Sequence, residues 1–345
     1  MSFIQTMTGG SIRHVTPVRK SAATGLTAAV YASLEREFAL VPPLTIHSPC
    51  PEVLAGAWVA MREAFIVDPE HRALRETVAS GVSLANACPY CVDIHTAMLD
   101  AGGDHALADS IRSAEGGDDA LIAWARATRH RGATELEHPP FAAQLIPQML
   151  GTAVLFHYIN RMVSVFLTES AAPVPLRSAV SRKLFGRTFG GTVGKHLLAA
   201  RAEPGASLDL LPDAPLPREF DWANADPLIA GGLARFNAAV ATAGSEHVPG
   251  TVRSLVLDRI AAWHGEDMPL SNRWLDEATT GLCRHDDRAA ARLALQSALC
   301  AYRVDDATIT DYRRHSSSDA ALVATVAWSS LAATRRIAGW MLPHG

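Results

Sequence analysis

Four side chains that can carry redox or acid–base chemistry lie within twenty residues of one another: Glu76, Cys88, Cys91 and His95. Cys88 and Cys91 form a CxxC pair, His95 follows Cys91 by four residues, and Glu76 precedes Cys88 by twelve. Two thiols at this spacing can interconvert between a dithiol and a disulfide. A histidine and a carboxylate beside them can move the protons that such a cycle requires. The pattern therefore indicates a thiol-based redox site with its own proton relay.

The residues around the two thiols predict a helix that carries them at its N-terminus. Pro89 is a favoured first helical residue because its missing N–H would have no intrahelical partner there, so Cys88 is the expected N-cap of a helix running to about Asp100. The partial positive charge at a helix N-terminus favours a thiolate, and we expect it to lower the pKa of Cys91 from about 8.5 towards 7. His95 shares the face of Cys91 and should reach it directly or through a water.

Glu76 belongs to an earlier predicted helix. Apolar residues recur at helical intervals over residues 74–85, which precede the CxxC pair. If the chain reverses at residues 86–87, the two helices form an antiparallel pair that brings Glu76 opposite His95. The carboxylate would then orient the imidazole, and the imidazole would act as base towards Cys91.

These four positions carry a resemblance to a known family. The chain resembles the AhpD-like alkylhydroperoxidase branch of the carboxymuconolactone decarboxylase family, whose signature is Glu, eleven residues, CxxC, three residues and His. The resemblance implies an all-helical oligomer that reduces organic hydroperoxides and disulfides. It implies that Cys91 is oxidised to sulfenic acid, that Cys88 is the resolving thiol and proton donor, and that Glu76 and His95 form the proton relay. Some members carry a His where this chain has Tyr90, so the relay here would be shorter or use water.

The same resemblance bears on cofactors and partners. It implies no metal, flavin or haem, and an external thiol reductant: a lipoylated protein, a thioredoxin-like protein or a small thiol. Two other interpretations of the CxxC pair are weaker. Cys-Pro-Tyr-Cys is also the glutaredoxin tetrapeptide, but the preceding residues lack the β-branched strand that such folds place there. A structural zinc site would need a fourth ligand and usually a second CxxC or His pair, which the sequence lacks.

Composition narrows the class of protein. Of the 345 residues, 48% are hydrophobic and 19% are charged, which favours a substantial folded core over disorder. A formal net charge of −4 gives no reason to expect a nucleic acid or an anionic membrane as partner. The N-terminus lacks the basic and apolar regions of a signal peptide, and five cysteines do not suggest a secreted disulfide framework. We therefore expect a cytoplasmic protein.

The chain divides into four predicted segments: an N-terminal arm over residues 1–25, an AhpD-like CxxC domain over 26–167, a linker or covering arm over 168–215, and a degenerate AhpD-like helical repeat over 216–345. The repeat rests on an offset of 176 residues between similar apolar patterns. Under this offset all four chemical positions are lost, because they fall on Val252, His264, Asp267 and Ser271. The two halves of one chain would then pack as two subunits do in a shorter homologue.

We assign structural rather than catalytic roles to the other polar and thiol groups of the sequence. Residues 154–165 resemble the closing helix of the same family, and we expect His157, Asn160 and Arg161 within it to pair with backbone at an interface rather than to line the site. Cys283 and Cys300 lie in or beside helical apolar stretches and are expected to be buried, inert thiols.

The sequence thus predicts an all-α, homo-oligomeric, thiol-dependent peroxidase or disulfide reductase acting on organic hydroperoxides. Two alternatives stay open. A non-catalytic redox-sensing or partner-binding protein would oxidise its dithiol without turning over. A decarboxylase-type enzyme of the same family would use acid–base chemistry and would not need the dithiol.

Overall fold

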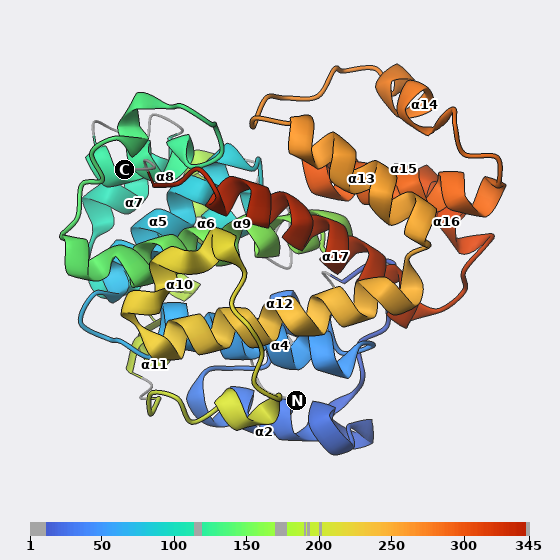
Figure 1. The fold of residues 1–345 in the computed structure, drawn as a ribbon. Coiled ribbons are helices and arrows are strands. Elements are labelled where there is room, and N and C mark those ends of the chain that lie inside the picture. Colours follow the sequence, from blue (N-terminus) through green and yellow to red (C-terminus); the bar gives the residue numbers. More distant parts are fainter. Residues whose placement is uncertain are drawn as a thin grey trace.

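The computed structural model describes residues 12–113, 119–169, 178–189, 191, 194–199 and 202–342. Over these residues the chain is all-α, as predicted, and its only β-type pairing is an isolated bridge between Ile12 and Leu167. No helix in this part of the chain is long and apolar enough to cross a membrane. Figure 1 shows two long helices, α12 (Pro227–His247) and α17 (Asp319–Ala338), which pack on each other and run across the molecule.

The first half of the chain surrounds α9, a helix of 21 residues of which nearly all are buried. Its neighbours α4 and α6, like α9 itself, begin with proline in the first turn, where the missing N–H costs no hydrogen bond. The bounds in this half are α2 Gly25–Glu37, α3 Pro42–Thr45, α4 Pro51–Met61 with a π-helical turn Arg62–Ile66, α5 Arg72–Ala85, α6 Pro89–Gly102, α7 His105–Arg112, α8 Ala120–Ala127 and α9 Ile146–Phe166.

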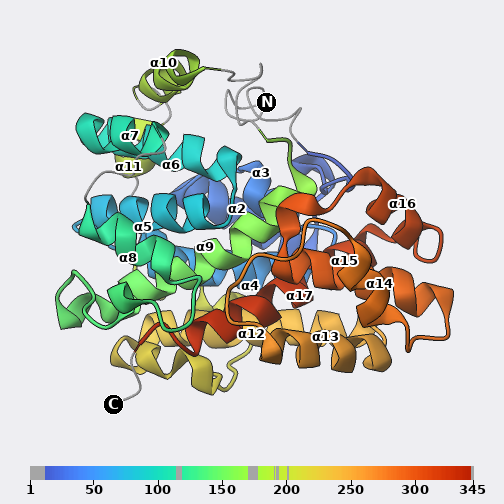
Figure 2. The same ribbon diagram turned by 90° about the horizontal axis from the view of Figure 1, so that it is seen from above.

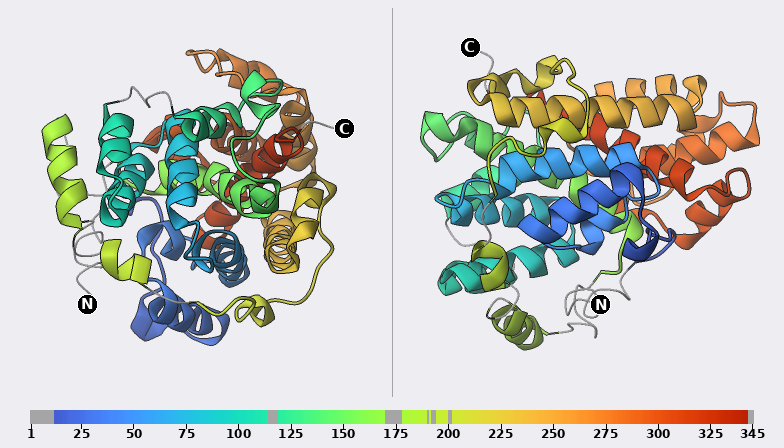
Figure 3. Two further views of the ribbon diagram at one scale, coloured as in Figure 1. Left: turned by 90° about the vertical axis from the view of Figure 1, so that its left-hand side faces the viewer. Right: turned by 90° about the horizontal axis from the view of Figure 1, so that it is seen from below.

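The predicted linker contains helices. Helix α10 (Ala179–Phe189) and the short α11 (Lys195–Ala199) both pack on α6, and α10 also contacts α7. Figure 3 shows α10 on the outside of the molecule beside α7. The prediction from weak helical periodicity therefore underestimated the helix content of this segment. The described helices of this segment therefore cover part of α6, the helix that carries the CxxC pair.

The second half is built from α12 Pro227–His247, α13 Gly250–Ala262, α14 Arg273–Thr279, α15 His285–Leu299, α16 Asp306–Arg313 and α17 Asp319–Ala338. It docks on the first half through two pairs of long helices: α12 packs on α4, and α17 packs on α9 (Figures 1 and 2). The two halves therefore share one continuous hydrophobic core.

Two glycines let α4 and α12 approach closely. A Cβ atom at Gly56 would lie 3.0 Å from the Cα of Phe236, and a Cβ atom at Gly232 would lie 3.4 Å from the Cα of Ala60. These four positions are related by the predicted offset, since Gly232 is Gly56 plus 176 and Phe236 is Ala60 plus 176. Each half thus places its glycine against the same position of the other half, which is the reciprocal pattern of a two-fold contact.

A buried histidine ties the loop before α4 to α9. His47 is fully buried, its Nδ1 lies 3.0 Å from the carbonyl oxygen of Leu44, and its Nε2 lies 3.0 Å from the hydroxyl of Tyr158. Burial lowers the pKa of His47 to about 4. The neutral imidazole donates to Leu44 and accepts from Tyr158, and burial away from water disfavours its protonated form.

We therefore expect stability to fall in mild acid. The unfolded chain takes up a proton at His47 near pH 6.5 and the folded chain only near pH 4, so acid favours unfolding as pH falls below about 6.5. The free energy of unfolding should drop by about 3 kcal/mol between these pH values through His47 alone. Urea titrations across this pH range measure the drop, and His47→Gln should reduce it by this amount, while the contribution of buried His157, whose pKa burial also lowers, should remain. An unchanged slope in that variant would contradict the assignment.

Candidate active site

The turn between α5 and α6 places the two cysteines. Helix α5 ends at Ala85, and Ala87 adopts a left-handed conformation with φ of 51°. The N–H of Ala87 donates to the carbonyl of Leu84 at 3.1 Å, and the N–H of Cys88 donates to that of Ser83 at 3.0 Å. This is the hydrogen-bond pattern of a Schellman C-cap. The chain reversal predicted at residues 86–87 is therefore present, and it brings Cys88 to the start of α6.

This turn yields a stability prediction. A left-handed conformation is unfavourable for alanine and costs glycine nothing, so Ala87→Gly should raise the free energy of unfolding by about 1 kcal/mol. Ala85→Gly, at the last residue of α5, should lower it by a similar amount, because glycine there only adds unfolded-state entropy. Denaturant titration of both variants measures the difference. Equal destabilisation by the two glycines would contradict the turn geometry.

The two thiols lie at the N-terminus of α6 as the sequence predicted. Cys88 is the N-cap residue, Pro89 begins the helix, and Cys91 lies in its first turn. Both cysteines are free and buried, and the Cys88 Sγ lies 2.8 Å from the Cys91 Sγ, towards which it donates a hydrogen bond. The two sulfurs are therefore close enough to form a disulfide after a small movement.

The pKa of Cys91 departs from the prediction. Burial raises it well above its ordinary value, and the adjacent Cys88 raises it further because two negative sulfurs so close together would repel each other. A hydrogen bond from Asn160 acts in the opposite direction without cancelling these effects. The prediction of a lowered pKa was wrong because it considered the helix N-terminus alone, whereas the cost of burying a charge is larger here.

Glu76 and His95 meet across the α5–α6 pair. The Nδ1 of His95 lies 2.6 Å from one carboxylate oxygen of Glu76, and the Nε of Arg72 donates to the other at 2.7 Å. Burial raises the pKa of Glu76, but Arg72 and His95 outweigh burial, so the pKa lies below its usual value. Glu76 is thus an anion at neutral pH and favours the His95 tautomer with its proton on Nδ1. The other ring nitrogen is then free to accept a proton.

Two aromatic rings fix the plane of the imidazole. His95 packs edge-to-face against Phe156, with ring centroids 4.5 Å apart, and against Phe65 at 5.8 Å. The Arg72 guanidinium lies over the Phe65 ring, 4.2 Å from its centroid. Phe65 and Phe156 have no signal in the sequence as site components, because their contacts with His95 arise between different helices. Arg72, in contrast, precedes Glu76 by four residues on α5, a spacing at which opposite charges pair on a helix.

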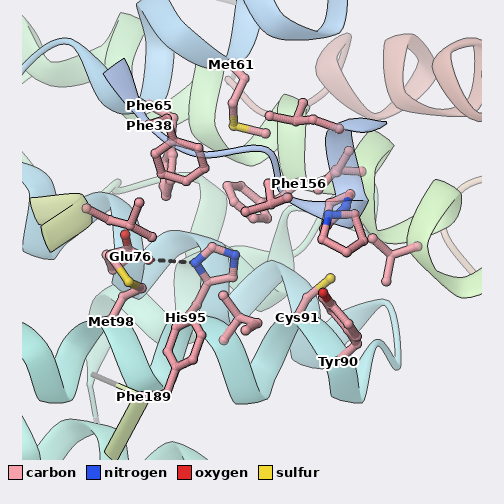
Figure 4. Close-up of a pocket in the computed structure, with 18 of the residues that line it drawn as sticks. Phe38, Met61, Phe65, Glu76, Tyr90, Cys91, His95, Met98, Phe156 and Phe189 are labelled. Atoms are coloured by element: carbon pink, nitrogen blue, oxygen red, sulfur yellow. Dashed lines mark hydrogen bonds and ion pairs between the residues drawn. The ribbon is translucent and has the colours of Figure 1, made fainter. Parts of the chain in front are cut away.

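Cys91 and His95 open into one apolar pocket of about 90 Å³. Figure 4 shows His95 between Glu76 and Cys91 within it. Cys88 is absent from its wall. The lining residues come from the loop before α4, from α4 to α6, from α9 and from the covering arm: Phe38, Val41, Pro42, Pro43, Leu44, Met61, Phe65, Arg72, Glu76, Tyr90, Cys91, Ile94, His95, Met98, Phe156, Ile159, Val163, Phe189 and Leu197.

Comparison with known proteins gives a match over almost the whole chain. An alkyl hydroperoxide reductase of Mycobacterium tuberculosis is 36% identical to the chain over 336 residues, which are 96% of this chain and 95% of that protein. The chain belongs to the AhpD-like alkyl hydroperoxide reductase family. No family model matches the chain, and no solved structure matches it significantly. The similarity covers both halves of this AhpD-like protein, so it extends well beyond the CxxC helix.

A buried polar network behind Cys91 was missed by sequence reasoning. Asn160 of α9 bonds to Cys91, donates to the Ser83 hydroxyl at 3.1 Å, and accepts from Asn86 at 3.0 Å. Asn86 also lies 3.1 Å from the ring of His157. The expectation that Asn160 pairs only with backbone at an interface was therefore wrong. The signal in the sequence was an amide side chain within an otherwise apolar helix. Asn160 is fully buried, and a buried amide needs specific hydrogen-bond partners.

The four positions of the second half that correspond to Glu76, Cys88, Cys91 and His95 under the offset of 176 residues do not form a second redox site. Val252 lies in α13, and the other three lie between α13 and α14, where Asp267 pairs with Arg129 at 2.6 Å. Of the remaining cysteines, Cys300 is buried as expected, but Cys283 is exposed, because it lies in the turn before α15 rather than on a packed helix face. In this AhpD-like chain the described residues therefore form one CxxC site.

One group of side chains in the described part has ligand atoms close enough for a metal: Asp68, Glu70 and His71. The Nδ1 of His71 lies 3.0 Å from a carboxylate oxygen of Asp68, and Arg75 lies 3.5 Å from the same oxygen. None of these residues lines the pocket of Cys91. The guanidinium opposes a cation there, so the group is better explained as an ion-pair cluster at the start of α5.

Proposed function

We propose that this AhpD-like protein is a thiol-dependent peroxidase that reduces organic hydroperoxides through the Cys88–Cys91 dithiol. One observation carries the proposal: Cys91 lines a narrow apolar pocket together with the Glu76-paired His95, while the second thiol lies 2.8 Å behind it and outside that pocket. A peroxide in the pocket would meet one thiol and one acid–base group. The second thiol would then be in place to capture the oxidised sulfur.

The proposed cycle has three steps. The Cys91 thiolate attacks the distal peroxide oxygen, the O–O bond breaks, and the alkoxide takes a proton and leaves as the alcohol. Cys91 is left as a sulfenic acid, which Cys88 attacks to form the disulfide with release of water. An external thiol then returns the disulfide to the dithiol, and its own thiols become oxidised.

His95 and Glu76 would manage the protons of this cycle. The free ring nitrogen of His95 accepts the Cys91 proton, through a water where needed, and returns it to the leaving alkoxide. Glu76 holds the imidazole by its Nδ1 and stabilises the imidazolium while it exists. The Asn160 amide, which bonds to Cys91, would stabilise the thiolate at the moment of attack. Together these groups offset part of the cost that burial imposes on the thiolate.

The pocket favours a hydroperoxide with an apolar substituent. Its wall is formed almost wholly by aliphatic and aromatic side chains, and the charged groups Arg72 and Glu76 pair with each other. An apolar substituent gains by leaving water for such a wall, whereas hydrogen peroxide has no group that can do so. We therefore expect a higher kcat/KM for an aryl or alkyl hydroperoxide than for hydrogen peroxide.

The raised pKa of Cys91 predicts the pH profile. Because the thiolate is the nucleophile and its pKa lies well above the usual value, kcat/KM for the hydroperoxide should rise from about pH 6 to beyond about pH 9 without a plateau. Initial rates of peroxide loss in constant-ionic-strength buffers measure the profile. A plateau that begins below about pH 7 would show a thiolate already formed and would contradict this assignment.

The function itself is tested by multi-turnover consumption of cumene hydroperoxide by the reduced protein with dithiothreitol in excess. We expect many equivalents of peroxide to be consumed per protein and cumyl alcohol to appear in equal amount. Loss of two thiols once, with peroxide remaining, would instead support the redox-sensing alternative. Unchanged thiols and unchanged peroxide would overturn both interpretations.

A further inference from the structure

A small polar cavity lies where the two halves of the chain meet. It has a volume of about 10 Å³ and lies where α9 meets α15 and the segment after it (Figure 2). The turn between α5 and α6 and the residues just after α8 complete its wall. The polar and thiol residues of this junction cavity are Asn86, Arg129, Asn160, Arg161, Ser164 and Cys300.

Arg161 brings a buried charge to the junction cavity. Its Nε donates to the carbonyl oxygen of Ala298 at 2.8 Å, and one Nη donates to that of His157 at 2.5 Å. In the part of the chain that the structure describes, Arg161 forms no ion pair with a carboxylate. Buried charges in proteins are normally paired, because taking a charge out of water is costly. The positive charge of Arg161 is therefore left without a negative partner from the described residues.

A second guanidinium adds to the positive charge. Arg129 is buried and pairs with Asp267 at 2.6 Å, but the Asp267 side chain is 73% exposed, so water screens this pair. Burial and then the like charge of Arg129 lower the pKa of Arg161 to about 9, so both arginines are cations at neutral pH. The same two charges, after burial, lower the pKa of His157. The junction cavity thus has a positive electrostatic potential.

The wall itself does not balance this charge. No acidic residue lines the junction cavity. Cys300 lies close enough to both guanidiniums for their charges to act on its thiol, but burial raises the pKa of Cys300 to about 11. The thiol is therefore neutral at pH 7. Each guanidinium has five N–H donors, and the contacts above use only one or two of them, so both can still bind an anion.

The size of the junction cavity limits what can bind there. A space of about 10 Å³ holds one particle of about the size of a water molecule, and chloride is close to that size. Sulfate, phosphate and carboxylic acids have several heavy atoms and do not fit. Tyr302, which also lines the cavity, is 44% exposed, so an ion can exchange with the solution.

We propose that the junction cavity binds one monovalent anion of the size of chloride beside Arg129 and Arg161, and that this anion stabilises the contact between the two halves of the chain. The anion would accept hydrogen bonds from the two guanidiniums and compensate the charge of Arg161. Since Arg161 belongs to α9 and bonds to Ala298 of α15, the ion would strengthen the junction of these helices. The proposal concerns the fold and does not depend on the peroxidase function.

The direct test is a crystal of the unmodified protein grown or soaked in sodium bromide, with anomalous scattering measured at the bromine edge. Bromide replaces chloride at such sites and is distinguished from water by its anomalous signal. We expect a peak in the junction cavity beside the guanidinium groups of Arg129 and Arg161. Peaks on the surface with none in the cavity would mean that the cavity holds water only, and would overturn the proposal.

Stability in solution gives a second test on the whole chain. Urea unfolding is measured in sodium chloride and in sodium gluconate at equal ionic strength, because gluconate is a monovalent anion too large for the cavity. A tenfold rise in chloride should lower the unfolding equilibrium constant about three- to tenfold, as one ligand does near or above its Kd. The same rise in gluconate should change it less than about twofold. Equal effects of the two salts would contradict a specific site.

Matched variants at Cys300 locate the effect. Cys300→Asp places a carboxylate beside both guanidiniums and should replace the anion, so chloride should then change the unfolding equilibrium constant less than about twofold. Cys300→Asn has almost the same shape without the charge and should keep the chloride dependence of the wild type. If Cys300→Asp keeps that dependence in full, chloride acts elsewhere and the proposal fails. If Cys300→Asp does not fold, the bromide experiment still decides.

Discussion

Replacing Cys91 with serine should lower kcat/KM for an organic hydroperoxide at least about 10³-fold, because the hydroxyl is a far weaker nucleophile than the thiolate and no other group in the pocket can take its place. The Cys91 side chain is buried with its sulfur against Cys88, and serine is smaller and nearly isosteric. The fold should therefore survive. Rates of peroxide loss with excess dithiothreitol measure the effect, and an unchanged circular dichroism spectrum shows that the loss is chemical.

Cys88→Ser is the matched control for this result. It keeps the attacking sulfur and removes the resolving one, so one equivalent of peroxide should be consumed and a sulfenic acid should accumulate on Cys91. Trapping with dimedone and mass spectrometry identifies the modified residue. If Cys91→Ser keeps substantial activity, the dithiol is not the reactive group and the decarboxylase-type alternative gains support. If the sulfenic acid appears on Cys88, the two thiols have exchanged roles.

Glu76→Gln should lower kcat/KM about 10²-fold and leave KM for the dithiol reductant unchanged. The amide can still contact the imidazole, but it carries no charge to stabilise the imidazolium and does not favour one His95 tautomer. Peroxide-loss rates at several pH values measure the effect. The variant should also need a higher pH to reach a given rate, and loss of packing alone would not cause this shift.

Glu52→Gln is the control for charge removal, because Glu52 is exposed at the start of α4 and lies outside the pocket. It should leave the rate unchanged. Glu76→Asp keeps the charge and should recover part of the loss. If Glu76→Gln retains activity within about twofold of wild type, the relay is not used and proton transfer must run directly to water.

The sequence was sufficient to predict those features of the site that depend on residues close together in the chain. The helix from Pro89, the reversal at Ala87 and the contact between Glu76 and His95 all follow from helical periodicity and turn rules, and the structure contains all of them. Recognition of the family followed from the same few residues. These features are local, or they link two helices joined by a short turn.

Rules that consider only neighbouring residues could not predict which groups become buried in the tertiary structure. The pKa of Cys91 is set by the helices that bury α6, and these override the helix N-terminus. Asn160 reaches the site from α9, a helix distant in the sequence, whereas Arg72 is a neighbour of Glu76 on α5. Whether a polar residue of an apolar helix points at a thiol or at an interface depends on the rotation of that helix, which a single sequence does not fix.

The predicted internal repeat gains physical support and remains our proposal. Helices α4 and α12 begin at Pro51 and Pro227, which are 176 residues apart, and Gly56 and Gly232 make reciprocal close contacts across their interface. A duplicated unit that pairs with its own copy would produce this pattern. The second unit would then be kept for the core that it completes through α12 and α17, and not for chemistry. The division at residues 168–215 and the homo-oligomer stay predictions.

The central claim is that Cys91 and Cys88 together reduce one hydroperoxide per cycle. Its most direct test is a single-turnover titration: the fully reduced protein, freed of external thiol, is mixed with cumene hydroperoxide in steps up to one equivalent, and cumyl alcohol, free thiols and the disulfide peptide are quantified. We expect one alcohol formed and two thiols lost per peroxide, with the disulfide between Cys88 and Cys91. Formation of alcohol without loss of these two thiols, or loss of thiols at other cysteines, would contradict it.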